Sequence, residues 1–282
     1  MFDKRRPAIV ASIILILLMT STGNTPGDGV HQTGFSLSTS SVQSALDEDI
    51  LIWEDIWGID SLDPTVSYEY QSWWILYNVY ETLYTYPFDE SSNQPDVPLL
   101  AAGPPAVSPD GLNYTITLRQ GITFHDNTPF NASCVKWNLE RGMKMFLQWG
   151  PVWMYAELLT GGKAVSDAAY EYGPSSSEFA TIFDNWVATS GAIEVIDTYT
   201  IRFVLAEPYP GFISVLCSPV CSVMSPTYAI LHASDPSWAT WEAYSVDYGE
   251  EHYWMIDHAC GTGPYILTSV IWDDLIELEK WD

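Results

Sequence analysis

The chain has 282 residues, enough to bury a sizeable core in one or two domains. It carries 36 acidic and 10 basic residues, a formal net charge of −26, and three basic residues fall within the first six positions. Such a surface repels nucleic acid and lacks a patch that neutralises phosphates, so nucleic-acid binding is excluded. The 13 Trp and 17 Tyr residues suit stacking on peptides, sugars or other partly apolar ligands, although most single aromatic side chains belong to cores.

Residues 1–28 have the pattern of a secretory signal peptide. Lys4, Arg5 and Arg6 precede an apolar run from Ala8 to Met19, which is too short for an ordinary membrane-spanning helix. An uncleaved N-terminal anchor stays open as an alternative. Residues 29–48 are rich in Ser, Thr and Gly and predict a flexible tether. We therefore expect a secreted protein at the cell surface or in the periplasm, on the outer face of the cytoplasmic membrane.

The folded part is expected to begin near residue 49. Ile50 to Ile56 predicts a strand, and Leu62-Asp63-Pro64 predicts a turn. The prolines between Tyr86 and Pro109 exclude a regular helix there. Before them, six residues recur at the spacing of one helical face and predict a helix with buried aromatic side chains: Trp73, Leu76, Tyr77, Tyr80, Leu83 and Tyr84.

The stretch from Gly111 to Met143 predicts a strand, a turn, a second short strand, a turn and a helix. Tyr114, Ile116 and Leu118 alternate with polar residues, the period of a half-buried strand. Asp126-Asn127 favours a turn, and Asn131 is a good N-cap for the helix that follows.

Further along the chain, the segment from Gly161 to Ser177 has the composition of a surface insertion, and Ser177 is a candidate cap for another helix. Ile193 to Leu205 alternates around Asp197-Thr198 and predicts a β-hairpin. The glycines of Gly261-Thr262-Gly263 allow a tight turn and a close approach of backbone to a ligand.

Together, these segments resemble the extracellular solute-binding proteins, family 5, of ABC importers for peptides, nickel and some sugars. Asn127 stands where the family usually has Gly, but Asn also tolerates positive φ. The resemblance covers Ile50 to Asp282 in family order. Its motifs are Leu62-Asp63-Pro64, Tyr80-Glu81-Thr82-Leu83, Leu118-Arg119-Gln120-Gly121, Phe124-His125-Asp126, Leu139-Glu140-Arg141, Glu207-Pro208-Tyr209-Pro210-Gly211-Phe212 and Gly261-Thr262-Gly263-Pro264-Tyr265.

The resemblance implies an α/β fold of the periplasmic-binding-protein type II kind in an incomplete form, with a first lobe and a small inserted domain but no second lobe. It divides the chain into a first-lobe part at 49–85, an inserted α/β domain at 86–192, and a truncated first-lobe part at 193–282. In the family, the segment that matches Leu278 to Asp282 leads into a further lobe. We therefore expect this chain to be an N-terminal fragment.

The resemblance also implies a solute receptor rather than an enzyme, without a cofactor, which delivers oligopeptides or dipeptides to ABC permease membrane subunits by hinge closure. Nickel complexes and oligosaccharides remain possible solutes, and a secreted carbohydrate-binding or carbohydrate-active protein is the alternative. The candidate ligand contacts come from three segments expected to face the cleft: Tyr68, Tyr70, Gln71, Trp149, Trp153 and Thr262.

The sequence predicts no catalytic or metal-binding constellation. The spacing of His252, Asp257, His258 and Cys260 matches no zinc pattern. Neighbouring acids such as Asp273-Asp274 would point to opposite faces of a strand, which argues against a glycosidase pair. Four cysteines allow three complete pairings. Cys221–Cys260 is preferred because both are expected in the first lobe, and Cys134 is expected to be a buried free thiol.

Overall fold

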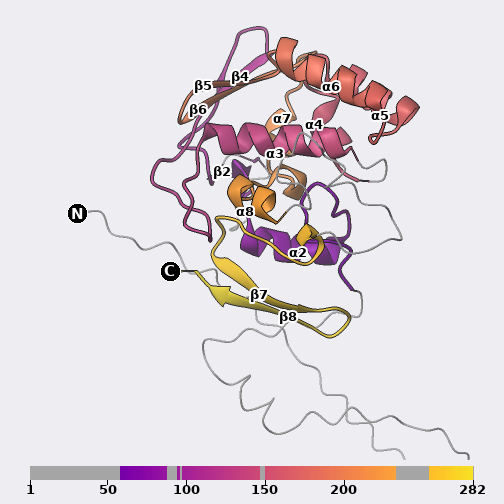
Figure 1. The fold of residues 1–282 in the computed structure, drawn as a ribbon. Coiled ribbons are helices and arrows are strands. Elements are labelled where there is room, and N and C mark those ends of the chain that lie inside the picture. The colour runs from indigo at the N-terminus through magenta and orange to yellow at the C-terminus, as the bar shows by residue number, and fades with distance from the viewer. Residues whose placement is uncertain (1–57, 88–93, 96, 147–149, 233–253, 282) are drawn as a thin grey trace, which may run out of the picture. The chain divides into compact units, whose positions relative to one another are not determined.

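The computed structural model describes residues 58–87, 94–95, 97–146, 150–232 and 254–281 (Figure 1). The predictions for the signal peptide, the tether, the strand at Ile50 to Ile56, and the side chains of Trp149 and His252 lie outside these residues. Within the described part, no helix is long and apolar enough to cross a membrane.

A four-stranded antiparallel sheet confirms the strand and hairpin that the alternating residues predict. Its order is β3-β4-β6-β5, with β3 at Ala106–Val107, β4 at Asn113–Thr117, β5 at Ile193–Asp197 and β6 at Thr200–Val204. Tyr114 pairs with Phe203, and Ile116 pairs with Ile201. All four side chains are buried, so one face of the sheet forms part of the core.

The pairing of β4 with β6 affects the predicted domain limits. It places residues 113–117 and 200–204 next to each other in one sheet. The limit predicted between residues 192 and 193 therefore separates the β5–β6 hairpin from the sheet to which it belongs. The division into lobe and inserted domain stays a prediction.

Helix α3 (Ala132–Met145) packs against β5, β6, α6 (Ser177–Thr189) and α8 (Pro226–Leu231), between the sheet and α2 (Figure 1). The predicted cap is confirmed: the Asn131 side chain accepts hydrogen bonds from the Ser133 and Cys134 N–H groups. Asn127 adopts φ 63°, as the turn requires.

The surface insertion predicted at Gly161 to Ser177 is wrong. After the short α4 (Trp153–Ala156), residues Gly162–Tyr172 form α5, which buries Val165, Ala168 and Ala169 and packs on α6. Its small buried residues gave a weak periodic signal between two glycine-rich turns. The cap of α6 is Ser176, one residue before the predicted Ser177, and its hydroxyl accepts from the Phe179 N–H.

Helix α2 (Tyr70–Val79) ends earlier than the sequence predicts. Tyr80 is extended, and Tyr84 lies in β1 (Tyr84–Thr85), which pairs with β2 (Val97–Pro98). Both tyrosines are buried as expected, but Tyr77 is 51% exposed. The helical face of α2 that is buried consists of Ser72, Leu76 and Val79.

The last elements are α7 (Phe212–Leu216), the 3₁₀ turns η1 (Pro219–Cys221) and η3 (Trp254–Ile256), and the hairpin of β7 (Tyr265–Ile271) and β8 (Leu275–Lys280). Strand β7 contacts α2, and a smaller apolar core joins the two. The larger core surrounds the four-stranded sheet and α3.

The predicted Cys221–Cys260 disulfide is wrong, because both cysteines are free and buried. Burial raises the pKa of Cys260 to about 12 and the pKa of Cys221 further, which favours the uncharged thiol. Cys134 is a buried free thiol, as predicted.

Candidate functional site

The loop before α2 is organised by the carboxylate of Asp60. Its Oδ1 accepts from the hydroxyls of Ser67 (3.2 Å) and Ser72 (2.5 Å), and its Oδ2 accepts from the Tyr68 N–H (2.9 Å). Ser72 lies in the first turn of α2, so these bonds fix the loop to the start of the helix. The Trp73 indole adds a bond from its Nε1 to the Ser67 carbonyl, at 3.1 Å.

This loop and helix present an exposed group of rings, which we name the α2 aromatic face: Tyr68, Tyr70, Trp74 and Tyr77, exposed by 47%, 64%, 43% and 51%. The last three residues recur at i, i+4 and i+7 and so share one side of α2. Tyr70 and Trp74 meet edge to face, with ring centroids 5.6 Å apart. Rings held in this way offer a large contact area with little loss of side-chain freedom on binding.

A buried ion pair anchors the same loop to α3. Arg141 Nη2 lies 2.5 Å from Asp63 Oδ2, and Nη1 lies 3.1 Å from Oδ1. Burial alone would raise the pKa of Asp63, but the Arg141 charge and hydrogen bonds from Arg141 and Thr65 outweigh it and lower that pKa. Asp63 therefore stays ionised and ties the loop to α3. Sequence reasoning missed this pair, although both residues lie in the family motifs.

A second junction joins three turns that are distant in sequence. The backbone N–H of His125 donates to the Gly261 carbonyl (2.9 Å), and the imidazole Nε2 of His125 lies 2.9 Å from the Gly263 carbonyl oxygen. The Gly263 N–H donates to the Val79 carbonyl at the end of α2, also at 2.9 Å. Nearby, the Ser225 hydroxyl donates to Asp126 Oδ2 at 2.6 Å. The His125-Asp126 turn thus has a structural role, and Gly261 and Gly263 approach the protein's own backbone.

The environment of His125 predicts a pH dependence. Burial lowers the pKa of His125, against the Gly263 hydrogen bond and the Asp126 charge, which raise it. As the pH falls below the ordinary value of about 6.5, the unfolded chain therefore binds this proton before the folded chain does. We expect the free energy of unfolding to decrease below about pH 6.5, and His125→Asn to reduce that slope.

Urea unfolding at pH 7.5, 6.5 and 5.5 checks this prediction. His258→Gln is the matched control, because it removes another imidazole, one that is 38% exposed and contacts Asp257 rather than the Gly261–Gly263 loop. Equal slopes for the unmodified protein and His125→Asn would contradict the assignment.

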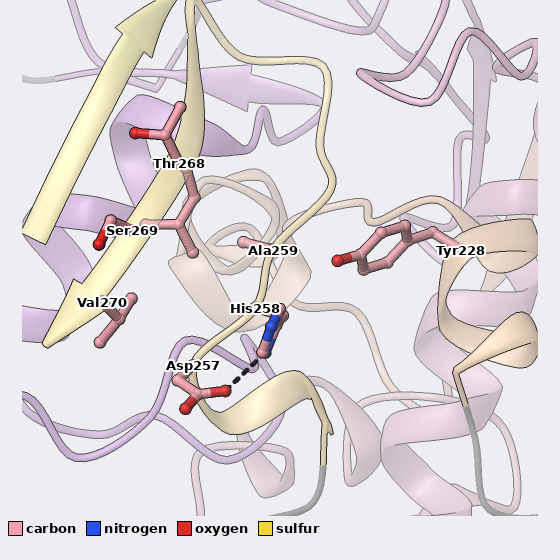
Figure 2. Close-up of a pocket in the computed structure, with 8 residues that line it drawn as sticks. Tyr228, Asp257, His258, Ala259, Thr268, Ser269 and Val270 are labelled. Carbon is pink, nitrogen blue, oxygen red and sulfur yellow. Dashed lines mark hydrogen bonds and ion pairs between the residues drawn. The ribbon is translucent and has the colours of Figure 1, made fainter. Parts of the chain in front are cut away.

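A cavity of about 150 Å³ lies between β7 and the segment 257–259 (Figure 2). Asp257 Oδ1 lies 2.6 Å from His258 Nδ1, and Asp257 Oδ2 accepts from the Trp272 indole at 3.2 Å. This volume is below the roughly 300–1,000 Å³ of typical ligand pockets, so the cavity is too small for a peptide. Among the described residues, no group of three His, Cys, Asp or Glu side chains could hold a metal ion.

The predicted contact residues fall in different places. Tyr68 and Tyr70 belong to the α2 aromatic face, with Gln71 half-buried beside them. Thr262 is 5% exposed and lies between Gly261 and Gly263, which contact Val79 at the end of α2, about 14 Å along the helix axis from Tyr70. Its hydroxyl has no hydrogen-bond partner among the described residues. The structure therefore does not bring Thr262 together with the two tyrosines.

Trp153 is 42% exposed in α4. Its neighbour Val152 and the loop residue Thr65 both pack over Gly142, because a Cβ at Gly142 would lie 3.4 and 3.0 Å from their methyl carbons. The segment of Trp153 thus meets the loop before α2 at the C-terminal end of α3. Sequence reasoning missed two members of the aromatic face, Trp74 and Tyr77. Their spacing from Tyr70 was the signal that could have found them.

The sheet, the helices around it and the loops that join them define a type II periplasmic-binding-protein fold, as predicted. The pheromone receptor PrgZ superposes with a TM-score of 0.58 at 24% identity, over 79% of this chain and 37% of that one. DppA from Helicobacter pylori, solved in complex with the peptide STSA, superposes with a TM-score of 0.54 at 23% identity, over 79% of this chain and 38% of that one.

Within that fold class, residues 97–282 match the bacterial extracellular solute-binding proteins, family 5 Middle, and the chain belongs to this family. Glutathione-binding protein GsiB of Escherichia coli O1:K1 / APEC is 30% identical over 175 residues, which is 62% of this chain and 24% of GsiB. GsiB of Salmonella typhi is 29% identical over the same length and the same shares. The match thus spans about a quarter of these relatives.

Proposed function

We propose that this protein captures short peptides outside the cytoplasm and delivers them to the membrane subunits of an ABC permease. The observation that carries the proposal is family membership over residues 97–282. Two further observations support it: the relatives include a glutathione-binding protein, and the similar folds include DppA in complex with a peptide. We also propose that residues 1–28 act as the export signal and that the solute-binding component has no enzymatic activity.

In this proposal the described residues supply one wall of the solute site. The hydrogen bonds of Asp60 and the buried Asp63–Arg141 pair hold the loop before α2 rigid. Tyr68, Tyr70 and Trp153 then offer ring surface to a peptide at a small cost in side-chain entropy. Gln71, Trp149 and Thr262 stay candidate contacts. Binding by this fold works through hinge closure of two lobes, which requires a rigid wall on each side.

Calorimetric titration of the purified full-length protein tests the proposal. The panel contains dipeptides to pentapeptides, glutathione, a nickel chelate and a set of oligosaccharides. We expect saturable binding of at least one peptide with a Kd of about 1 μM or tighter, which corresponds to about −8 kcal/mol. Free amino acids serve as the control for non-specific heat. Binding or hydrolysis of a sugar without any peptide binding would contradict the proposal and favour the carbohydrate alternative.

A further inference from the structure

We propose that the α2 aromatic face selects peptides with positively charged side chains, lysine or arginine, over peptides with negatively charged ones. This inference rests on the proposed function and specifies its substrate class.

The first argument concerns the basic side chains that could pair with an acidic solute. Apart from Lys4, Arg5 and Arg6, every Lys and Arg lies in the described ranges and already has a partner there. Ion pairs hold Lys136 to Glu140, Arg141 to Asp63, Lys144 to Asp184, Lys163 to Asp167 and Arg202 to Glu194. Arg119 donates to the carbonyls of Ala101 and Pro98, and Lys280 also has an interaction partner. A solute carboxylate would have to compete with these partners.

The second argument is the charge around the rings. The segment 58–79, which contains the whole α2 aromatic face, has no Lys, Arg or His but three acids: Asp60, Asp63 and Glu69. Asp63 is neutralised by Arg141, whereas Glu69 is exposed between Tyr68 and Tyr70. The N-terminus of α2 would attract an anion by itself, but Glu69 is its N-cap residue and brings negative charge to that place.

The third argument is the chemistry of the rings. The face of a Tyr or Trp ring attracts an ammonium or guanidinium group within about 6 Å of its centroid, while the aliphatic stem of Lys or Arg packs on the apolar surface. Tyr70 and Trp74 are edge to face and are 64% and 43% exposed, so part of their ring surface is open to solvent in the described structure. Exposed rings beside a carboxylate therefore complement a cationic side chain and oppose an anionic one.

Charge also argues against a second copy of this chain on the same face. A symmetric dimer through α2 would bring Glu69 of each copy to one interface, between chains of net charge −26. Like charges placed close together oppose association. We therefore assign the face to a cationic solute.

The test uses three tetrapeptides that differ only in one central residue, Lys, Gln or Glu, titrated into the full-length protein at 0.1 M and 1 M salt. We expect the Lys peptide to bind about tenfold more tightly than the Glu peptide, with Gln between them. Part of this ratio should persist at 1 M salt, where the Debye length is about 3 Å and only direct contacts remain. Trp74→Leu and Glu69→Gln should each reduce the ratio several-fold. Tyr172→Leu, an equally exposed ring on α5, should leave it unchanged.

Each other outcome overturns the inference in a distinguishable way. Equal affinities for the three peptides would leave the proposed function in place but remove the charge selectivity. In one such outcome, the ratio of Lys-peptide to Glu-peptide affinity vanishes at 1 M salt, or Tyr172→Leu reduces it as much as Trp74→Leu does. Either result would assign the selectivity to the general acidity of the chain and not to the α2 aromatic face. Dimers in sedimentation that Trp74→Leu abolishes would show that a second copy covers the face. No peptide binding at all would reject the proposed function itself.

Discussion

Asp63→Asn is expected to destabilise the protein by about 3–5 kcal/mol, because it leaves the charge of Arg141 buried without its partner. The two side chains are 0% and 1% exposed, and the Asp63 carboxylate also accepts hydrogen bonds from the N–H and hydroxyl of Thr65. The substitution should loosen the loop that carries Tyr68 as well. Urea unfolding at pH 7 measures the loss.

Two further variants separate this pair from ordinary surface charges. Asp167→Asn breaks the exposed Lys163–Asp167 pair and should cost about 1 kcal/mol or less. The double variant Asp63→Leu/Arg141→Met removes both charges and should be more stable than Asp63→Asn, since no unpaired charge stays buried. If Asp63→Asn cost no more than Asp167→Asn, the pair would not be the anchor that we describe.

The same pair predicts the response to acid. The pKa of Asp63 is lowered in the folded chain, so its contribution to stability is present above its unfolded pKa of about 3.9 and is lost as the pH falls through the folded value. Below about pH 4, the free energy of unfolding should therefore fall more steeply with decreasing pH for the unmodified protein than for Asp63→Asn.

Gly261→Ala is expected to destabilise the protein by about 3 kcal/mol or more. A Cβ at this position would lie 2.1 Å from the Val79 carbonyl oxygen and 2.9 Å from Tyr80 Cα. Both are backbone atoms, so no rotamer change relieves the contact. The backbone would have to move, and the His125–Gly261 and Gly263–Val79 hydrogen bonds would then lengthen or break.

Gly103→Ala is the matched control, because a Cβ there meets no atom within 4 Å. It should change stability by about 0.5 kcal/mol or less, or stabilise the chain slightly by restricting its unfolded state. Thermal unfolding of the two variants side by side measures the difference. Similar midpoints would show that the loop at Gly261 does not pack against α2 as closely as the structure has it.

Features that depend on near neighbours in the chain can be predicted from the sequence alone. The alternation of Tyr114, Ile116 and Leu118 specifies a strand with one buried face, and Asn131 caps the next helix through bonds to residues two and three positions on. The family motifs, taken in order, also gave the fold class that the matched family and structures confirm. Such features can be predicted because their physical cause lies within a few residues of the same segment.

The candidate site could be predicted from the sequence only in part. The sequence predicts Tyr68 and Tyr70 as ligand contacts, and both lie on the exposed α2 aromatic face. It also predicts Tyr77 in the core, although that ring is 51% exposed, and Thr262 in the same site as the tyrosines. Apolar spacing shows that one side of a segment is buried, yet Trp73, Leu76 and Tyr77 fit the pattern as well as the true buried face of Ser72, Leu76 and Val79 does. The local pattern is ambiguous because large aromatic residues occur on both sides of α2.

Contacts between distant segments of the chain could not be predicted from local patterns and are seen in the folded structure. Asp63 and Arg141 are 78 positions apart, and His125 joins Gly261 and Gly263 across a still longer separation. The early end of α2 was decided in the same way: Tyr80 and Tyr84 are buried in an extended segment after the helix, although their spacing is also helical. Burial and charge pairing stabilise these long-range contacts once the groups lie close together. Whether they lie close together depends on the course of the whole chain, which a pattern of neighbouring residues does not contain.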